Sequence, residues 1–305
     1  MKRLSERKIV LVIRETRLAN LKARFATRAQ AKFYVSRLGQ DFGDYEREEN
    51  AYRGAIAQAQ ETLAGVGRVQ VVDRKLLPNF VFGPEDIVVA LGQDGLVANT
   101  LKYAGELPLI GVNPDPARWD GRLLPFQVKD LGKVAADTFR NARPVCLVDM
   151  AEAELNTGTQ LFAVNDLFIG VRGHSSARYR ITVNGQSEDH SSSGVIVSTG
   201  LGSTGWYRSI ITGAAAIAGV KTPPTDFAWD SGELRFSVRE PFPSRVTGTA
   251  IVSGKVMGGK TLVLESSMGE GGVIFSDGIE SDFLEFNSGT KATIRLARRK
   301  GRLVQ

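Results

Sequence analysis

The N-terminal part of the chain alternates short, continuously apolar runs with longer Pro-free stretches of mixed polarity. A strand that is covered on both faces of a parallel sheet requires such a continuous apolar run. Strands that alternate with helices in this way indicate parallel βαβ units. The predicted strands are Ile9–Ile13, Val69–Val72, Ile87–Leu91 and Leu109–Val112, and the predicted helices are Arg24–Leu38, Tyr45–Leu63 and Leu96–Tyr103.

The pattern changes at about Pro144, where short strand-like segments begin to recur between Gly, Ser and Asn residues. Short strands at such spacing are typical of an antiparallel β domain. The predicted strands are Leu161–Ile169, Tyr179–Val183, Val195–Ser198, Leu234–Val238, Thr249–Val252, Thr261–Leu264 and Val273–Phe275. A helical segment, Ser203–Ile217, interrupts them.

This change predicts the fold class and the domains. A chain of 305 residues is long enough for about two domains. We expect an α/β fold with an N-terminal Rossmann-like parallel-sheet domain (1–143) for nucleotide binding and a mostly antiparallel β substrate domain (144–290). A basic C-terminal segment, 291–305, is either solvated, in contact with a phosphate, or packed back on the first domain.

Composition excludes several classes of protein. The chain is 42% hydrophobic and 24% charged and has one cysteine, Cys146, so it is neither disordered nor a disulfide scaffold. No apolar run approaches the roughly 20 residues of a membrane span. The five-residue run Ile9–Ile13 is too short for a signal peptide, which favours a cytoplasmic location. The net charge of +6 is compatible with nucleic acid or with a nucleotide enzyme, but no interleaved aromatics support nucleic-acid binding.

The first chemical motif is Gly92-Gln93-Asp94-Gly95, which lies between a buried strand and a helix. Ligands bind at the carboxyl ends of parallel strands, and glycines there let the backbone approach a phosphate. A carboxylate repels phosphate, so Asp94 is expected to accept a proton, to accept a hydrogen bond from a hydroxyl, or to hold a metal. A phosphate loop with one carboxylate fits phosphoryl transfer to an alcohol, with the carboxylate as the base. The alternative is a turn in which Asp94 caps the helix.

The second motif runs from Thr199 to Trp206 and contains two glycines followed by Ser203 and Thr204. Backbone N–H groups and hydroxyls at a helix start favour a negative ligand. Trp206 is either a ring that stacks on a base or a core residue. The two histidines, His174 and His190, have no metal-ligand spacing and are expected on the surface or in loops, and Cys146 is expected to be a buried small hydrophobe.

Taken in order, these motifs resemble those of the NAD kinase family of ATP-dependent phosphotransferases, most closely its mitochondrial branch. The four similar stretches cover most of the chain: Gly92–Gly95, Val164–Gly170 with its Asn165-Asp166 pair, Ser192–Trp206, and Asp277-Gly278. The segments Ile110–Pro116 and Val238–Pro241 resemble the mitochondrial branch in particular.

The resemblance implies a function and a set of site residues. The implied reaction transfers a phosphoryl group from ATP to the 2′-hydroxyl of the adenosine ribose of NAD, giving NADP, in a homo-oligomer. Mg²⁺ would be carried on the ATP phosphates rather than by protein ligands. Asp94 matches the family's base. The implied phosphate and nucleotide contacts are Gly92, Gln93, Gly95, Gly202 and Ser203, and the implied NAD contacts are Asn165, Asp166, Ser193, Thr204, Trp206 and Asp277. The site is expected between the two domains.

Three residues depart from the family pattern. Gln93 replaces the second glycine, Leu96 replaces a threonine, and Asp166 stands where glutamate is usual. Two alternatives therefore remain open: a phosphotransferase that acts on another hydroxyl, such as a lipid or a sugar, or a nucleotide-binding protein without activity.

Overall fold

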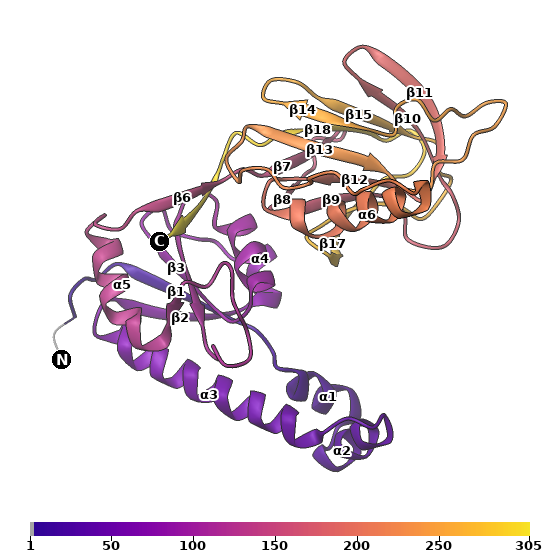
Figure 1. Ribbon diagram of the computed structural model, residues 1–305. Coiled ribbons are helices and arrows are strands. Elements are labelled where there is room, and N and C mark those ends of the chain that lie inside the picture. The colour runs from indigo at the N-terminus through magenta and orange to yellow at the C-terminus, as the bar shows by residue number, and fades with distance from the viewer. Residues whose placement is uncertain (1–2) are drawn as a thin grey trace. The chain divides into compact units, whose positions relative to one another are not determined.

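The structure is a computed structural model that describes residues 3–305 (Figure 1). The chain divides into two compact units. The first comprises the residues up to Cys146 together with Arg302–Gln305, and the second comprises Leu147–Gly301. Both ends of the chain therefore belong to the same unit.

The described part of the first unit is built on a seven-stranded sheet in the order β2-β1-β3-β4-β19-β6, with β5 paired to β4. The pairs β1–β2, β1–β3, β3–β4, β4–β5 and β4–β19 are parallel. The strands are β1 (Lys8–Ile13), β2 (Arg68–Asp73), β3 (Ile87–Leu91), β4 (Pro108–Asn113), β5 (Phe126–Gln127), β6 (Val145–Val148) and β19 (Gly301–Val304). The helices are α1 (Arg17–Phe25), α2 (Arg28–Arg37), α3 (Phe42–Ala64), α4 (Asp94–Ala104) and α5 (Leu131–Phe139), with short 3₁₀ turns η1 (Arg74–Asn79) and η2 (Val128–Asp130).

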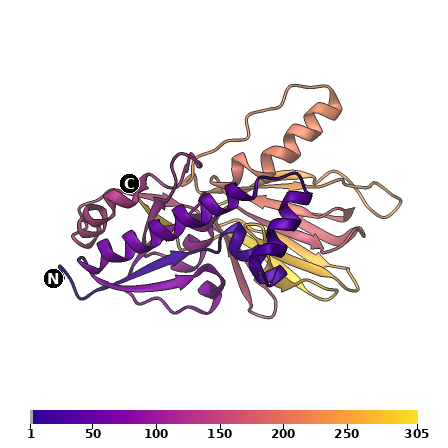
Figure 2. The same ribbon diagram turned by 90° about the horizontal axis from the view of Figure 1, so that it is seen from below.

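Helices bury both faces of this sheet, as the continuous apolar runs predict. Leu11 and Val89 point into the core that α3 and α5 cover, while Val10 and Val88 are equally buried on the other face. Helix α4 contacts β3 and β4. Figure 2 shows the long α3 lying over the strands. The carboxyl ends of the parallel strands are thereby held at one fixed edge.

The predicted helix Arg24–Leu38 is wrong in its limits, because two helices share this region. Helix α1 ends at Phe25, and Ala26 adopts a left-handed φ of 60°. Thr27 then starts α2, with its hydroxyl accepting from the Gln30 N–H at 3.2 Å. A threonine N-cap satisfies an unpaired amide of the first helical turn, which makes the break a defined boundary.

The second unit consists of two six-stranded antiparallel sheets and one α-helix within the described residues. One sheet has the order β11-β10-β15-β18-β7-β8 and the other β14-β13-β12-β9-β16-β17. The first contains β7 (Ala151–Leu155), β8 (Gln160–Ala163), β10 (Ala177–Val183), β11 (Gln186–Ser192), β15 (Leu262–Ser266) and β18 (Lys291–Leu296). The second contains β9 (Asp166–Val171), β12 (Val195–Ser198), β13 (Glu233–Val238), β14 (Ser253–Met257), β16 (Gly272–Ser276) and β17 (Ile279–Glu285). The 3₁₀ turn η3 (Gly202–Thr204) precedes α6 (Trp206–Ala218).

One core fills the space between the two sheets, with Ile169 and Phe236 from one sheet and Ile181 and Leu264 from the other. On the opposite face of the β9 sheet, Phe168 packs with residues of α6 (Figure 1). The predicted fold class, a parallel α/β domain followed by antiparallel β sheets, is confirmed.

Two predicted strands of the second unit are wrong. Leu161–Ile169 is two strands, β8 and β9, because the chain leaves the sheet at Val164 and Asn165. Thr249–Val252 is a loop rather than a strand. Its amides bond to a side chain instead of a neighbouring strand, since the Glu188 carboxylate accepts from Ala250 and Ile251 at 2.9–3.1 Å.

Residues 291–305 form β18, a turn and β19. Of the three alternatives for this segment, the solvated tail is therefore wrong, and β19 pairs with β4 in the sheet of the first unit. Arg295 pairs with Glu152 at 2.6 Å, and Lys300 pairs with the buried Asp149 at 2.7 Å. The position predicted for His190 is also wrong, because its ring is buried and lies 2.7 Å from Glu188.

Cys146 and His174 were also assigned a position from the sequence. The side chain of Cys146 is only partly buried, rather than fully buried as expected. His174 is exposed in the loop after β9.

Candidate functional site

The Gly92–Gly95 loop follows β3 at the carboxyl edge of the parallel sheet. The Gly92 N–H donates to the Val112 carbonyl of the neighbouring strand at 3.0 Å. A Cβ at Gly92 would lie 2.8 Å from Leu96 Cδ2, so any larger residue here would have to displace the buried Leu96 side chain. Leu96, which stands where the family pattern has threonine, therefore packs in the core and contributes no hydroxyl.

Asp94 is the first residue of α4, and its carboxylate is held by backbone amides of another loop. Oδ1 accepts from Leu123 N at 2.7 Å, and Oδ2 accepts from Arg122 N at 3.2 Å. The N-cap position belongs to Gln93, which makes no side-chain capping bond. The interpretation of Asp94 as a helix cap is therefore wrong, and its carboxylate has a fixed orientation at the start of the helix.

Arg14 is a second charged group beside this loop, and the motif search missed it. It directly follows β1, the strand next to β3, and its Cδ lies 3.7 Å from where a Cβ at Gly92 would stand. Its side chain is 12% exposed and is held by Glu48 Oε1 at 2.9 Å and by the Glu15 carbonyl at 3.0 Å. Within residues 3–305 its buried Nε has no hydrogen-bond partner. An arginine directly after the first apolar strand was the available signal.

Tyr52 of α3 fixes the backbone around Arg14. Its hydroxyl donates to the Leu91 carbonyl at 2.7 Å and accepts from the Arg14 N–H at 2.9 Å. Burial raises the pKa of Tyr52 to about 12. The ends of β1 and β3 are thus tied together where the Gly92–Gly95 loop begins.

In the second unit, Asp277 orders the Asn165-Asp166 pair. The Asp277 carboxylate accepts from Val164 N at 3.0 Å and from Asn165 N at 2.6 Å. Asp277 is itself in a left-handed conformation, with φ of 55°, in the turn between β16 and β17. Its carboxylate therefore satisfies a loop that would otherwise leave amides unpaired.

Asp166 begins β9 and is 8% exposed. Burial, with a smaller contribution from the nearby Asp277 charge, raises the pKa of Asp166 to about 7. At neutral pH the carboxyl group therefore exists in both protonation states, and it can accept or donate a hydrogen bond to a ligand hydroxyl.

The Thr199–Thr204 loop closes over the same segment. Thr199 N donates to the Asn165 carbonyl at 2.9 Å, and a Cβ at Gly202 would lie 2.1 Å from that oxygen. The Ser203 hydroxyl is buried and donates to the Gly200 carbonyl at 2.7 Å, whereas Thr204 is partly exposed. Asn165, Asp166, Thr199 and Gly202 thus belong to one compact cluster, and Thr204 ends the 3₁₀ turn that begins at Gly202.

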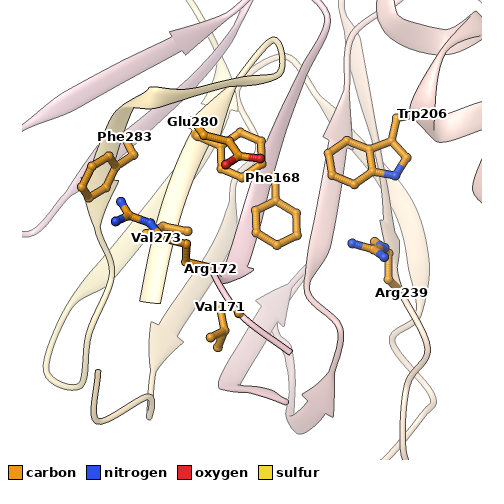
Figure 3. Close-up of a pocket in the computed structure, with 10 residues that line it drawn as sticks. Phe168, Val171, Arg172, Trp206, Arg239, Val273, Glu280 and Phe283 are labelled. Atoms are coloured by element: carbon orange, nitrogen blue, oxygen red, sulfur yellow. The ribbon is translucent and has the colours of Figure 1, made fainter. Parts of the chain in front are cut away.

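Ser193 and Trp206 lie apart from the cluster around Asn165 and Asp166. Ser193 precedes β12, whereas Ser198 at the other end of that strand is paired with Asp166. Trp206 lies on the outer face of the sheet, stacked with Phe168 at a centroid distance of 5.7 Å (Figure 3). Its ring is partly exposed beside a cavity, so it is not simply a core residue.

Residues 3–305 contain no group of three or more His, Cys, Asp or Glu side chains arranged to hold a metal ion. No helix in that part of the chain is long and apolar enough to span a membrane.

Solved kinases share this fold. The structure of yeast NADH kinase complexed with NADH matches with a TM-score of 0.55 at 14% identity, over 98% of this chain and 84% of that one. An NAD kinase from Archaeoglobus fulgidus in complex with ATP matches with a TM-score of 0.54 at 16% identity, over 98% of this chain and 93% of that one.

The chain therefore has the fold of NAD and NADH kinases. No protein-family model and no curated protein sequence matches it. At this level of identity the similarity concerns the fold, and the closeness to the mitochondrial branch remains a prediction.

Proposed function

We propose that the chain is an ATP-dependent phosphotransferase that phosphorylates the 2′-hydroxyl of the adenosine ribose of NAD. The observation that carries the proposal is the fixed Asp94 carboxylate in a glycine loop at the carboxyl edge of the parallel sheet. The fold shared with NAD and NADH kinases supports it. We further propose a homo-oligomer acting in the cytoplasm, in line with the family resemblance.

Asp94 acts as the general base in this mechanism. A carboxylate offers about four lone-pair positions, so the two amide contacts leave room to accept the proton of a ribose hydroxyl. A base must lie within about 2.6–3.2 Å of the oxygen whose proton it takes. The amides of Arg122 and Leu123 hold the oxygens in place before substrate arrives, which reduces the reorganisation that the reaction requires.

The phosphates of ATP bind against the Gly92–Gly95 loop in this proposal. The first turn of α4 carries amides with partial positive charge, which favour phosphate. Gln93 contributes its side chain where the family has a second glycine, and Arg14 adds a positioned guanidinium. When bound on the phosphates, Mg²⁺ would neutralise part of their charge and draw electron density from the transferred group.

The acceptor nucleotide is assigned to the cluster in the second unit. The Asn165 amide and the Asp166 carboxyl supply hydrogen-bond partners for adenine and ribose, and Thr204 supplies a partly exposed hydroxyl. Ser203 and Asp277 act mainly through the loops that they hold, because their polar atoms bond to protein backbone. Ser193, Trp206 and Gly202 keep their predicted contacts as part of the proposal.

Two observations favour a second candidate function. Leu96 is buried and provides no hydroxyl, and Gln93 occupies space near the phosphate loop. A different alcohol, a lipid or a sugar, is therefore the alternative acceptor, and a nucleotide-binding protein without turnover is the third candidate.

The test supplies purified protein with ATP, Mg²⁺ and one acceptor at a time: NAD, a sugar, or a lipid alcohol. Transfer to NAD with appearance of NADP supports the proposal. Transfer only to a sugar or lipid would replace it with the second candidate. Thermal stabilisation by NAD and ATP without turnover on any acceptor would leave the binding protein.

A further inference from the structure

The first unit contains a cavity at the amino edge of its parallel sheet that the phosphotransfer proposal does not use. We name it the amino-edge pocket; its volume is about 290 Å³. The strands β1, β3 and β4 begin at this edge, whereas the Gly92–Gly95 loop follows the opposite end of β3. The pocket is therefore separate from that loop. Its charged side chains are Arg7, Glu85, Asp86, Glu106, Arg143 and Arg302.

Three of these six side chains already have partners within the protein. The Arg7 guanidinium donates to the Glu85 carbonyl at 2.9 and 3.1 Å and lies 3.7 Å from the Glu85 carboxylate. The Asp86 carboxylate pairs with Lys8 Nζ at 2.9 Å and accepts from the Gly83 N–H at 2.8 Å. The two cations and the two carboxylates cancel in charge, so none of them needs a ligand.

Arg143, Arg302 and Glu106 differ, because their charged groups lack partners in the part of the chain that the structure describes. Within it, neither guanidinium and no oxygen of the Glu106 carboxylate forms a hydrogen bond or an ion pair. The Nε of Arg143 is buried without a hydrogen-bond partner, and its guanidinium lies 4.9 Å from the centre of the Phe126 ring. A buried charged group without a partner costs free energy, which a ligand with matching groups would recover.

Strand pairing brings these three side chains to the same edge of the sheet. Arg302 of β19 is in register with the first residue of β4, and Glu106 lies two residues before that strand. The Pro144 carbonyl accepts from Gln305 N at 2.9 Å, which holds the segment of Arg143 beside β19. The pocket is thus built on paired backbone, which positions its side chains before a ligand arrives.

We propose that the amino-edge pocket binds an acidic α-amino acid, such as glutamate or aspartate. The two carboxylates of the ligand bond to the guanidinium groups of Arg143 and Arg302, and its ammonium group bonds to the Glu106 carboxylate. Two unpaired cations and one unpaired carboxylate leave one net positive charge, and an acidic amino acid carries one net negative charge at neutral pH. The volume is close to the lower end of the roughly 300–1,000 Å³ of ligand pockets, so the pocket suits a compact ligand and not a nucleotide.

Isothermal titration calorimetry with the full chain tests the class of ligand. L-glutamate and L-aspartate are each compared with the dicarboxylate that lacks the amino group, glutarate or succinate, and with the amide, glutamine or asparagine. We expect one of the two acidic amino acids to bind and its four-group comparison compounds to bind at least about tenfold more weakly. No binding of either amino acid at about 10 mM would overturn the proposal. Equal binding of the dicarboxylate without an amino group would overturn it as well.

The contacts are tested by Arg143→Gln, Arg302→Gln and Glu106→Gln, with the exposed Arg37→Gln and Glu61→Gln as controls for net charge. Each pocket variant should weaken the amino acid about tenfold, and neither control should change its affinity. Glu106→Gln should also reduce the preference for the amino acid over the dicarboxylate, which a merely structural role would not do. Circular dichroism confirms that each variant is folded. Unchanged affinity in folded Arg143→Gln and Arg302→Gln would overturn the proposal.

A last titration separates this pocket from the proposed nucleotide site. The amino acid is titrated into protein that already contains saturating NAD and ATP. Retained binding supports a separate site, whereas competitive displacement by either nucleotide would place the amino acid in the nucleotide site and overturn the proposal. Neither outcome depends on NADP formation, so failure of the phosphotransfer proposal would leave this result interpretable.

Discussion

Three aspartates of the sequence motifs, Asp94, Asp166 and Asp277, have different structural environments that the motifs do not predict. Asp94 and Asp277 both accept backbone amides, at distances as short as 2.7 and 2.6 Å. Asp166 instead lies buried at the start of a strand. The motifs correctly mark these positions as special, but the sequence does not show which amides each carboxylate binds, because the partners lie 28 to 113 residues away.

Replacing Asp277 should destabilise the second unit. In Asp277→Ala the amides of Val164 and Asn165 lose their acceptor, and a buried unsatisfied amide costs about 1–3 kcal/mol. Urea unfolding should show this loss, while Asp120→Ala, which removes an exposed carboxylate, should leave the midpoint unchanged. An Asp277→Ala midpoint equal to that of the wild type would contradict the structural role.

Asp166 predicts a pH dependence of stability. Its pKa is raised by burial from its ordinary value of 3.8 to about 7, so between these values the folded state binds more protons than the unfolded state. The contribution of Asp166 to the free energy of unfolding is therefore most favourable below about pH 4, and it decreases as the pH rises toward and through 7. Asp166→Asn should remove this fall and unfold at higher urea than the wild type at pH 8. The same urea midpoint difference at pH 4 and pH 8 would contradict the assignment.

At the scale of elements, apolar patterning predicts the central strands well. β3 and β4 contain the predicted segments, because both of their faces are buried. The errors occur where side chains decide the backbone: the Thr27 cap that splits α1 from α2, and the Glu188 carboxylate that holds 250–251 as a loop. Strands with mainly polar residues, such as β11, were missed because their pairing comes from a neighbouring strand.

The close packing of the η3 turn against Asn165 leaves no room for a side chain at Gly202. A Cβ there would lie 2.1 Å from the Asn165 carbonyl oxygen, so Gly202→Ala must displace the loop from the Asn165-Asp166 segment. We expect a loss of about 1–3 kcal/mol, typical of overpacking, measured by thermal unfolding. Gly213→Ala in α6 meets nothing within 4 Å and should be neutral or stabilising. Equal melting temperatures for the two variants would count against the predicted contact.

At the scale of the whole molecule, the last residues complete the first unit. β19 pairs with β4, and Leu303 and Val304 are 1% and 0% exposed. The basic composition of this segment suggested a solvated tail. An apolar pattern of only four residues is too short to predict a strand, and the sequence does not show that its partner lies nearly 200 residues earlier.

Deleting residues 301–305 should therefore disrupt the first unit. The loss of two buried side chains costs about 2–5 kcal/mol each, in addition to the lost strand pairing. Far-UV circular dichroism and melting curves should show reduced structure, whereas Arg302→Ala, at an exposed position, should melt like the wild type. A truncated chain with an unchanged melting curve would disprove this role.

The central claim is that Asp94 is the base of a phosphotransferase acting on NAD, and NADP formation by Asp94→Asn tests it most directly. The amide oxygen still accepts from the Leu123 N–H, and only the longer contact with the Arg122 N–H is lost, so the variant should fold. The amide cannot take the proton of the ribose hydroxyl. We predict a rate about 10²–10⁴-fold below the wild type, with Asp120→Asn fully active. Wild-type protein that forms NADP at the same rate as Asp94→Asn would contradict the claim.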